Sequence, residues 1–283
     1  MFGFLNIYKP QGKTSHDVIA ILRRVTKIKQ IGHTGTLDPF AEGVLPVCIG
    51  KATRLIEYLE DDKAYIGTIQ LGKSTTTYDI EGEVVNYSDK KVTLQEIQEI
   101  LPKFRGEIEQ FPPIYSAIKV KGKKLYEYAR NGENVEIKSR KVNIHKLELV
   151  DFDEKKQTIE LKIECSKGTY IRSIAHDLGE ALGCWGHLIK LVRIKAGKFE
   201  LGEAIKLDSL ETKEQVEKNL IYPLGYLEYP KYELNESEKE KVSHGMAIKT
   251  DVEKGTVILT QNGKLIAVAQ VENNKAKVSK VFI

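Results

Sequence analysis

Asp38, within the segment Gly32–Pro39 (GHTGTLDP), is the side chain of this sequence best suited to chemistry. Gly32 and Gly35 allow a left-handed backbone and the close approach of another segment, while Pro39 moves Asp38 out of the helical region. A carboxylate on such a stiff, tight loop can act at one atom of a bound substrate. In an isolated Asp-Pro pair, the aspartate is more often a turn residue whose side chain bonds to the nearby backbone. Whether Asp38 has a catalytic role therefore depends on the rest of the chain.

A cation that could complement this acid occurs in the segment Cys165–Arg172 (CSKGTYIR). The helical pattern over Thr169–Leu182 places Arg172 in the first turn, beside Tyr170. A positive charge there opposes the helix dipole, which implies a partner anion such as a carboxylate or a phosphate. Asp38 is the natural candidate. The alternative is an exposed arginine at the start of a surface helix.

Positive charge gathers in residues 114–146. This segment contains nine Lys and Arg residues and three Glu residues, a net charge of +6, so the rest of a chain with a total of +4 sums to −2. Tyr115, Tyr126 and Tyr128 lie among these charges, and such a mixture offers phosphate neutralisation together with flat faces for bases or sugars. Nucleic-acid binding and a solvated, charged hairpin both remain open for this segment taken alone.

The elements that must position these side chains mix strand and helix. Ser15 is expected to cap a helix whose apolar residues continue to Ile28, and the Asp38 loop follows that helix. The periodicity predicts strands at 2–8, 65–71, 142–150 and 158–165, and helices at 55–59, 93–101, 125–131 and 169–182. Because the order lacks regular βαβ alternation, we predict an α+β domain built on a largely antiparallel sheet.

The chain is predicted to divide into a domain of residues 1–228 and a smaller one of residues 229–283. An acidic helical stretch is expected from Asp208 to Leu220, before the boundary. The second domain is expected to hold a charged helix over 237–243 and short strands at 256–260, 265–270 and 276–281. Gln261-Asn262-Gly263 is a hairpin signal, so this domain is predicted to be a small β-rich module.

Composition and motifs argue against several classes of function. Hydrophobic residues make up 41% and charged residues 30% of 283 residues, and no apolar stretch approaches the length of a membrane span, so we expect a globular, cytoplasmic protein. The three cysteines have no close pair and are expected to be buried thiols, and the six histidines lack ligand spacing, so no metal is predicted. No P-loop or dinucleotide fingerprint is present, so neither nucleotide hydrolysis nor redox chemistry with a dinucleotide is supported.

Asp38, Arg172 and the basic segment lie within longer segments that resemble the TruB family of tRNA pseudouridine synthases. The matching segments run in family order through most of the first two thirds of the chain, at Lys9–Ser15, Gly32–Arg54, Tyr65 with Leu71-Gly72, Thr75–Gly82, Phe111–Gly132 and Cys165–Gly183. The resemblance implies a pseudouridine synthase fold with a basic, thumb-like insertion, which corresponds to residues 114–146. It also implies that the C-terminal module is an RNA-binding domain of the PUA type.

The family's reaction isomerises uridine 55 in the T loop of tRNA to pseudouridine without a cofactor. The bond from uracil N1 to ribose C1′ breaks, the base turns while held, and its C5 joins the sugar. By resemblance Asp38 is the catalytic aspartate, which acts either by attacking C1′ or by taking a proton from C2′, and the sequence does not separate these routes. Arg172 matches the arginine that pairs with Asp38 and should lower its pKa, and Asp79 matches a second acid that anchors the arginine.

A uridine stacked inside folded RNA must be extruded, at a cost that contacts in the pocket have to offset. The resemblance implies that Tyr65 stacks on the flipped base and handles its C5 proton, and that Tyr170 and Leu191 line the pocket. His33 matches a histidine that meets the RNA beside the flipped nucleotide. Arg54 stands at a family position for a basic residue and is expected either to touch phosphate or to lie on the surface. Residue type alone would place the two tyrosines and Leu191 in the core.

The expected partner is the T stem-loop of tRNA, bound by a monomer. Two other functions stay open from the sequence. One is a tRNA-binding or tRNA-folding module whose pocket is incidental, against which the intact set of Asp38, Arg172 and Tyr65 argues. The other is hydrolysis of a glycosidic bond by Asp38 with another acid, which the lack of an obvious proton donor for a leaving group weakens.

Overall fold

A ten-stranded mixed sheet forms the centre of the computed structural model, which describes residues 1–283. Its strands are β1 (Gly3–Lys9), β2 (Ile31–His33), β3 (Glu42–Ile49), β4 (Lys63–Leu71), β7 (Gly106–Gln110), β10 (Arg140–Asp153), β11 (Thr158–Cys165), β12 (Gly186–Ala196), β13 (Phe199–Glu200) and β14 (Ile205–Lys206). They follow the order β14-β1-β3-β12-β4-β11-β10-β7, with β2 beside β3 and β13 beside β12. Only β1 with β14 and β3 with β12 pair in parallel, which confirms the predicted α+β class on a largely antiparallel sheet.

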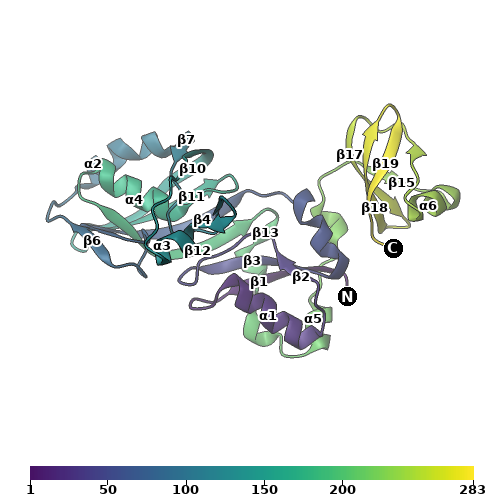
Figure 1. The fold of residues 1–283 in the computed structure, drawn as a ribbon, viewed down its shortest axis with the longest axis horizontal. Helices are drawn as coiled ribbons and strands as arrows, with labels where there is room; N and C mark the ends of the chain where they lie inside the picture. The colour runs from purple at the N-terminus through teal and green to yellow at the C-terminus, as the bar shows by residue number, and fades with distance from the viewer.

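Helices cover the two halves of this sheet. Helix α1 (Ser15–Thr26) packs Val18, Ile19 and Leu22 against β1 and β3, and α4 (Ile171–Ala181) lies on β12 and β4 (Figure 1). The remaining elements of this part are η1 (Gly50–Tyr58), β5 (Lys73–Thr75), β6 (Val84–Tyr87), α2 (Leu94–Ile100), η2 (Leu101–Phe104), η3 (Leu201–Glu203), η4 (Leu207–Ser209), α5 (Lys213–Lys218) and η5 (Pro223–Tyr226). None of the helices is long and apolar enough to cross a membrane.

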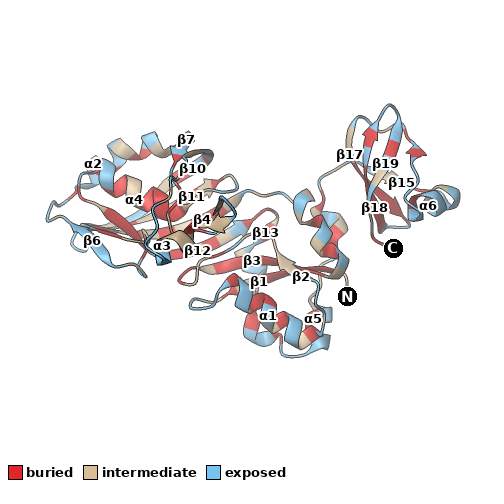
Figure 2. Cartoon of the chain, viewed as in Figure 1, coloured by how far each residue is buried: buried red, intermediate tan, exposed pale blue.

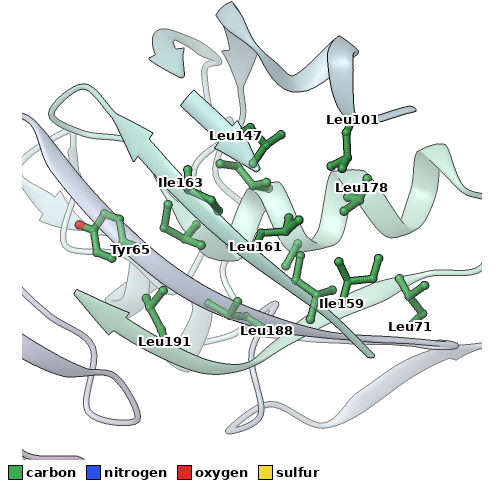
Figure 3. Close-up of a cluster of buried hydrophobic side chains, with 14 of the residues drawn as sticks. Tyr65, Leu71, Leu101, Leu147, Ile159, Leu161, Ile163, Leu178, Leu188 and Leu191 are labelled. Carbon is green, nitrogen blue, oxygen red and sulfur yellow. The ribbon is translucent and has the colours of Figure 1, made fainter. Parts of the chain in front are cut away.

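The largest core lies between α4 and the β4, β10, β11 and β12 part of the sheet. Strand β11 buries alternate residues, as its predicted period of two requires, and these meet Leu178 of the helix (Figure 3). Tyr65 and Leu191 lie at one end of this cluster, so the core continues to the edge of the candidate site. Buried residues gather in the strands of the two sheets, and the outer loops are mostly exposed (Figure 2). The three cysteines are free and buried, as expected.

Three local predictions differ from the structure. Helix α1 is capped by Thr14, whose side chain accepts a hydrogen bond from Asp17 N in a capping box, and Ser15 is the first helical residue. The segment predicted as a helix at 55–59 belongs to the 3₁₀ helix η1. The stretch from Asp208 to Leu220 is not one helix, because Thr212 caps a separate short helix, α5, and η4 precedes it.

Part of the basic segment forms a small unit outside the main sheet. It contains the two-stranded ribbon of β8 (Lys119–Val120) and β9 (Lys123–Lys124), followed by α3 (Leu125–Arg130), before the chain returns to the sheet in β10. The tyrosines of this unit lie against its cations, with Lys123 Nζ 4.6 Å from the ring centre of Tyr128 and Arg130 Cζ 5.4 Å from that of Tyr126. Positive charge and aromatic surface are therefore presented together.

Residues 231–281 form a second, five-stranded sheet. It consists of β15 (Lys231–Glu233), β16 (Ile248–Lys249), β17 (Gly255–Gln261), β18 (Lys264–Glu272) and β19 (Lys275–Val281), with α6 (Glu236–Ser243) beside it. Asn262 and Gly263 have φ of 49° and 71°, as the predicted tight hairpin requires. Ile258, Val268 and Phe282 share a core with Phe4 of β1, so this sheet packs on the first part of the chain. Its assignment to the PUA type stays a prediction, as does the boundary at residue 229.

Candidate active site

Ser15 fixes the loop of Asp38 from the side of α1. Its buried hydroxyl accepts a hydrogen bond from Leu37 N at 2.8 Å and lies 3.1 Å from Leu37 O, to which it donates. This contact joins the start of the helix to the residue just before the acid. The serine that was expected to cap its own helix thus positions the loop instead, while Thr14 supplies the cap.

Arg193 of β12 fixes the same loop through backbone carbonyls. Its Nε donates to Val44 O at 2.7 Å, one terminal nitrogen donates to Gly35 O at 3.1 Å, and the other donates to Thr36 O at 3.4 Å. Gly43 makes this approach possible, because a Cβ there would lie 2.3 Å from the carbonyl oxygen of Arg193, and its φ is +106°. Asp38 is therefore carried by a loop bonded at three successive residues, 35 to 37.

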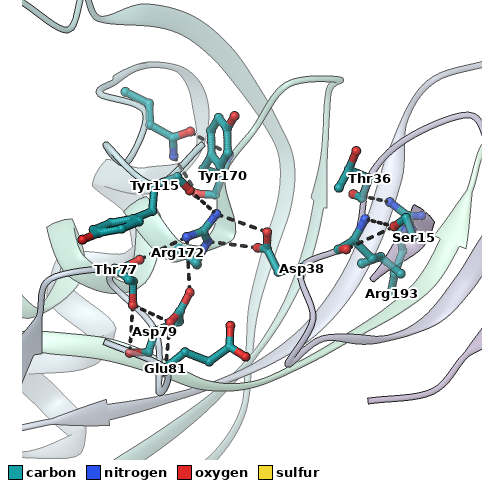
Figure 4. A network of polar contacts seen from close by, with 12 residues as sticks. Ser15, Thr36, Asp38, Thr77, Asp79, Glu81, Tyr115, Tyr170, Arg172 and Arg193 are labelled. Atoms are coloured by element: carbon teal, nitrogen blue, oxygen red, sulfur yellow. Dashed lines mark hydrogen bonds and ion pairs between the residues drawn. The ribbon is translucent and has the colours of Figure 1, made fainter. Parts of the chain in front are cut away.

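Arg172 brings two carboxylates together at the start of α4 (Figure 4). One terminal nitrogen donates to Asp38 Oδ1 at 3.2 Å, and Nε forms an ion-pair contact of 2.9 Å with Oδ2, without the alignment of a hydrogen bond. The other terminal nitrogen donates to Asp79 Oδ2 at 3.2 Å. The guanidinium also donates to the carbonyls of Thr77 at 3.2 Å and Tyr115 at 3.1 Å. The predicted partnership of Arg172 with Asp38 is thus present in the structure.

Asp79 combines the two roles that the sequence allowed. Its Oδ1 accepts hydrogen bonds from Thr77 Oγ1 at 2.5 Å and Glu81 N at 3.0 Å, as a turn aspartate does. Its Oδ2 faces Arg172, and the side chain is 3% exposed. Tyr78, with a φ of 63°, turns the chain so that Asp79 points inward, and its ring stacks on His176 of α4 at 3.8 Å. The acid therefore holds Arg172 from behind the cavity.

The charge state of Asp38 reflects two opposing effects. Burial raises the pKa of Asp38 above its usual value, and the positive charge of Arg172 counteracts part of this rise. Arg172 therefore acts on the pKa of Asp38 with the predicted sign, but burial outweighs it and the pKa is raised overall. The side chain of Asp38 is still 32% exposed, so water reaches it from the cavity. The result is a carboxylate with more basic character than an ordinary surface aspartate.

Asp38 and Arg172 lie in a cavity of about 410 Å³, a size in the range of small-molecule sites. Tyr65, Tyr170 and Leu191 line it as predicted, and they come from β4, the start of α4 and β12. Gln110 holds Tyr170 in place, because its amide accepts from Tyr170 N at 2.7 Å and donates to Tyr170 O at 3.0 Å. The cavity is thus lined by the carboxylate of Asp38, by two aromatic side chains and by the apolar side chain of Leu191.

The mouth of the cavity is basic. Lys63, Lys167 and Arg140 line it, and Asp61 bridges the two lysines at 2.9 and 2.6 Å. Arg140 lies over the ring of Tyr170, with Cζ 4.7 Å from the ring centre. Tyr115 and Tyr126 of the basic segment reach the same rim. The cavity lining therefore carries more positive than negative charge, which suits a polyanion.

Besides Asp79, two further predicted site residues lie outside the cavity lining. His33 is in β2, directly before Thr34 of the lining; burial lowers its pKa, and its Nδ1 is buried without a hydrogen-bond partner. Arg54 lies in η1, where it donates to Val281 O at 3.0 Å and covers the ring of Phe282. Arg54 therefore contacts the C-terminal sheet and not the cavity.

Sequence reasoning missed Ser15 as a positioning residue, and it missed Gln110 and Arg193 altogether. For Arg193 a signal exists, because it follows Leu191 by two residues in a strand and so shares its face. A separate set of potential metal ligands, His176, Asp177 and Glu180, gathers on α4 with ligand atoms within 4.8 Å of one another. Such partly exposed acidic groups are common without an ion, and these residues do not line the cavity.

The sequence was compared with protein families and with individual proteins of known family. Residues 23–171 match the TruB family pseudouridylate synthase (N terminal domain), and residues 172–227 match the tRNA pseudouridylate synthase B C-terminal domain. The chain is 43% identical over 287 residues to a tRNA pseudouridine synthase B of Caldanaerobacter subterraneus subsp. tengcongensis, covering 99% of both chains. It is 39% identical over 284 residues to one of Bacillus cereus, covering 95% of this chain and 92% of the relative.

Solved structures give the same result at greater distance. A chain of a Cbf5-Nop10-Gar1 complex superposes with a TM-score of 0.76 at 26% identity, over 100% of this chain and 85% of the other. A chain of an H/ACA RNP bound to a substrate RNA containing 2′-deoxyuridine gives a TM-score of 0.74 at 25% identity, with the same coverage. Since the family match covers more than half of the sequence and full-length relatives share about 40% of it, this chain belongs to the TruB family of pseudouridine synthases.

Proposed function

We propose that this protein isomerises uridine 55 in the T loop of tRNA to pseudouridine, with Asp38 acting on the ribose and no cofactor. The observation that supports this most is the ion pair of Asp38 and Arg172 at the base of a cavity walled by Tyr65, Tyr170 and Leu191. The curated relatives, which are named tRNA pseudouridine synthase B, support tRNA as the substrate class. The T-loop position rests on the family resemblance.

The reaction needs an acid that stays next to the sugar while the base moves. Asp38 either attacks C1′ or removes the C2′ proton, and in both routes the electron pair of the C1′–N1 bond leaves with uracil. Tyr65 and Tyr170 provide surfaces on which the detached base is held as it turns. After C5 has joined C1′, the proton on C5 must be lost, and the Tyr65 hydroxyl is the proposed group that handles it.

Binding of the RNA is proposed to use the basic rim and the basic segment of residues 114–146. Lys63, Lys167 and Arg140 would neutralise phosphates around the everted nucleotide, and Tyr126 would contact bases or sugars. The C-terminal sheet, as a PUA-like RNA-binding domain, would add contacts to another part of the tRNA. His33 would meet the RNA beside the cavity. We propose that the protein acts as a cytoplasmic monomer.

Replacement of Asp38 by Asn tests this function. Asp38→Asn keeps the size of the side chain but removes the basic oxygen, so single-turnover formation of pseudouridine in an unmodified tRNA transcript should fall at least about 1000-fold. Affinity for the tRNA should change little, because the basic rim is untouched. The control is Asp208→Asn, an exposed residue outside the cavity, which should behave as wild type.

The products also separate the alternatives. Modification mapped to the T loop is expected, with the tRNA chain intact and no free uracil. Release of free uracil would instead indicate glycosidic hydrolysis. Normal pseudouridine formation by Asp38→Asn, or tRNA binding by the wild-type protein without any modification, would contradict the proposal.

A further inference from the structure

Arg193 is a buried cation without a counter-ion. The residue is 1% exposed, and no carboxylate oxygen lies within 4.0 Å of its charged nitrogens. Three hydrogen bonds of its guanidinium go to backbone carbonyls and its side chain also contacts the Tyr65 hydroxyl, in contrast to Arg172, which faces two carboxylates. A buried charge that lacks an opposite charge is costly to the folded protein. Its position at the wall of the cavity suggests that the opposite charge comes with the substrate.

The strand register places Arg193 directly opposite Tyr65. The two residues are cross-strand partners in the antiparallel pair of β12 and β4, and both line the cavity. The charge of Arg193 also opposes the effect of burial on the pKa of Tyr65, which is raised overall. On the other side of the Asp38 loop, Arg172 faces the carboxylate itself (Figure 4). The cavity thus has one cation at the acid and another at the tyrosine wall.

We propose that Arg193 stabilises the negative charge that uracil carries while it is detached from the ribose. This inference rests on the proposed function. If Asp38 attacks C1′, its carboxylate becomes a neutral ester and the electron pair of the broken bond passes to N1 of uracil, spread over the adjacent carbonyl oxygens. If Asp38 takes the C2′ proton, it becomes a neutral acid and the same pair passes to uracil. In both routes one negative charge moves from Asp38 to the base.

Arg193 is suited to this task because its charge stays fixed while the substrate charge moves. Arg172 orients the carboxylate for the reaction, but its own charge lies at Asp38, the group that the negative charge leaves. A cation held by the carbonyls of Gly35, Thr36 and Val44 cannot swing toward Asp38, so its field acts on the base that is held against Tyr65. Preorganised charge of this kind favours the state in which the charge has moved.

The test compares Arg193→Gln on two substrates, the T stem-loop with uridine or with 5-fluorouridine at the target position. Fluorine withdraws electrons and stabilises the detached base without help from the protein. Single-turnover disappearance of the target nucleoside, measured by digestion and chromatography, should fall about 100- to 1000-fold for uridine. For 5-fluorouridine the fall should be at least about tenfold smaller.

Ser15→Ala is the matched control, since it loosens the same loop without removing a charge. It should slow both substrates by the same factor. Arg193→Lys keeps the charge and is decisive if Arg193→Gln does not fold. Arg193→Lys should retain more than about a tenth of the wild-type rate on uridine. Its loss of rate should be the same for uridine and for 5-fluorouridine.

Equal losses on the two substrates for Arg193→Gln, or a loss for Arg193→Lys as large as about 100-fold, would overturn the inference and leave Arg193 a structural residue. These outcomes are distinct from failure of the proposed function. In that case the wild-type protein itself would not isomerise the uridine substrate.

Discussion

Replacement of Arg172 by Lys tests whether the fork geometry of the guanidinium, beyond its charge, is needed. In the wild-type protein three nitrogens make separate contacts, with Asp38 Oδ2 at 2.9 Å, Asp38 Oδ1 at 3.2 Å and Asp79 Oδ2 at 3.2 Å. An ammonium group is a compact point charge and cannot contact both carboxylates in this arrangement. Arg172→Lys should therefore keep one contact with a carboxylate and lose two.

The expected loss can be worked out from these contacts. A hydrogen bond to a charged group contributes about 1.5–3 kcal/mol, and the buried ion-pair contact of Nε is taken to contribute about as much, so two lost contacts amount to about 3–6 kcal/mol. Water can replace part of this, because Asp38 is 32% exposed, whereas Arg172 and Asp79 are only 6% and 3% exposed. A net loss of about 2–4 kcal/mol corresponds to a decrease in rate of about 30- to 1000-fold.

The assay is single-turnover pseudouridine formation with saturating enzyme, measured between pH 5 and 9. Burial already raises the pKa of Asp38, and a weaker cation should raise it further, so the acidic limb of the pH–rate profile should move to higher pH in Arg172→Lys. Binding of tRNA should change less than about threefold. Arg24→Lys, an exposed substitution on α1, serves as the control. A rate within about threefold of wild type, with an unmoved acidic limb, would refute the role given to the fork.

Two further predictions concern the supports of the site. Ser15→Ala leaves Leu37 N buried without its acceptor and should lower the free energy of unfolding by about 1–3 kcal/mol, as measured by denaturant titration; an unchanged midpoint would contradict this. Lys9 is fully buried against the carbonyls of Pro10 and Lys13, and burial lowers its pKa to about 8. Because the unfolded chain binds this proton more tightly, the contribution of Lys9 to stability should rise between pH 8 and 10.5. Lys9→Met should remove that rise, and an unaltered pH dependence would show that Lys9 does not cause it.

Much of the site could be predicted because short segments constrain their own backbone. The glycines and the proline around Asp38 predict a tight loop, and a loop holds Asp38 in the structure. Gly32 and Gly35 are not among the glycines with positive φ, and only side-chain atoms lie near them, so the expected left-handed backbone is absent there. Likewise, the alternation in β11 and the helical spacing in α4 predict the two layers of the largest core. The charge of residues 114–146 predicts a basic unit, which the fold places at the cavity mouth.

The remaining features depend on contacts between residues far apart in the sequence. Whether Arg172 meets Asp38, 134 residues away, depends on how α4 packs across β4 and β12, and the resemblance suggested the pair without its geometry. The sign of the pKa shift of Asp38 depends on burial, which local sequence does not encode. Arg193 looks like an ordinary strand residue until β3 and β12 meet at Gly43 and enclose it.

The sequence by itself determined which residues could carry chemistry, the class of the fold and the family. Spacing and residue type govern local conformation, and those effects act over a few residues. Only the tertiary structure decided which charges are desolvated, which are paired and which one is left without a partner. Electrostatic free energies depend on distance and on the surrounding dielectric, and both are set when separate elements pack together.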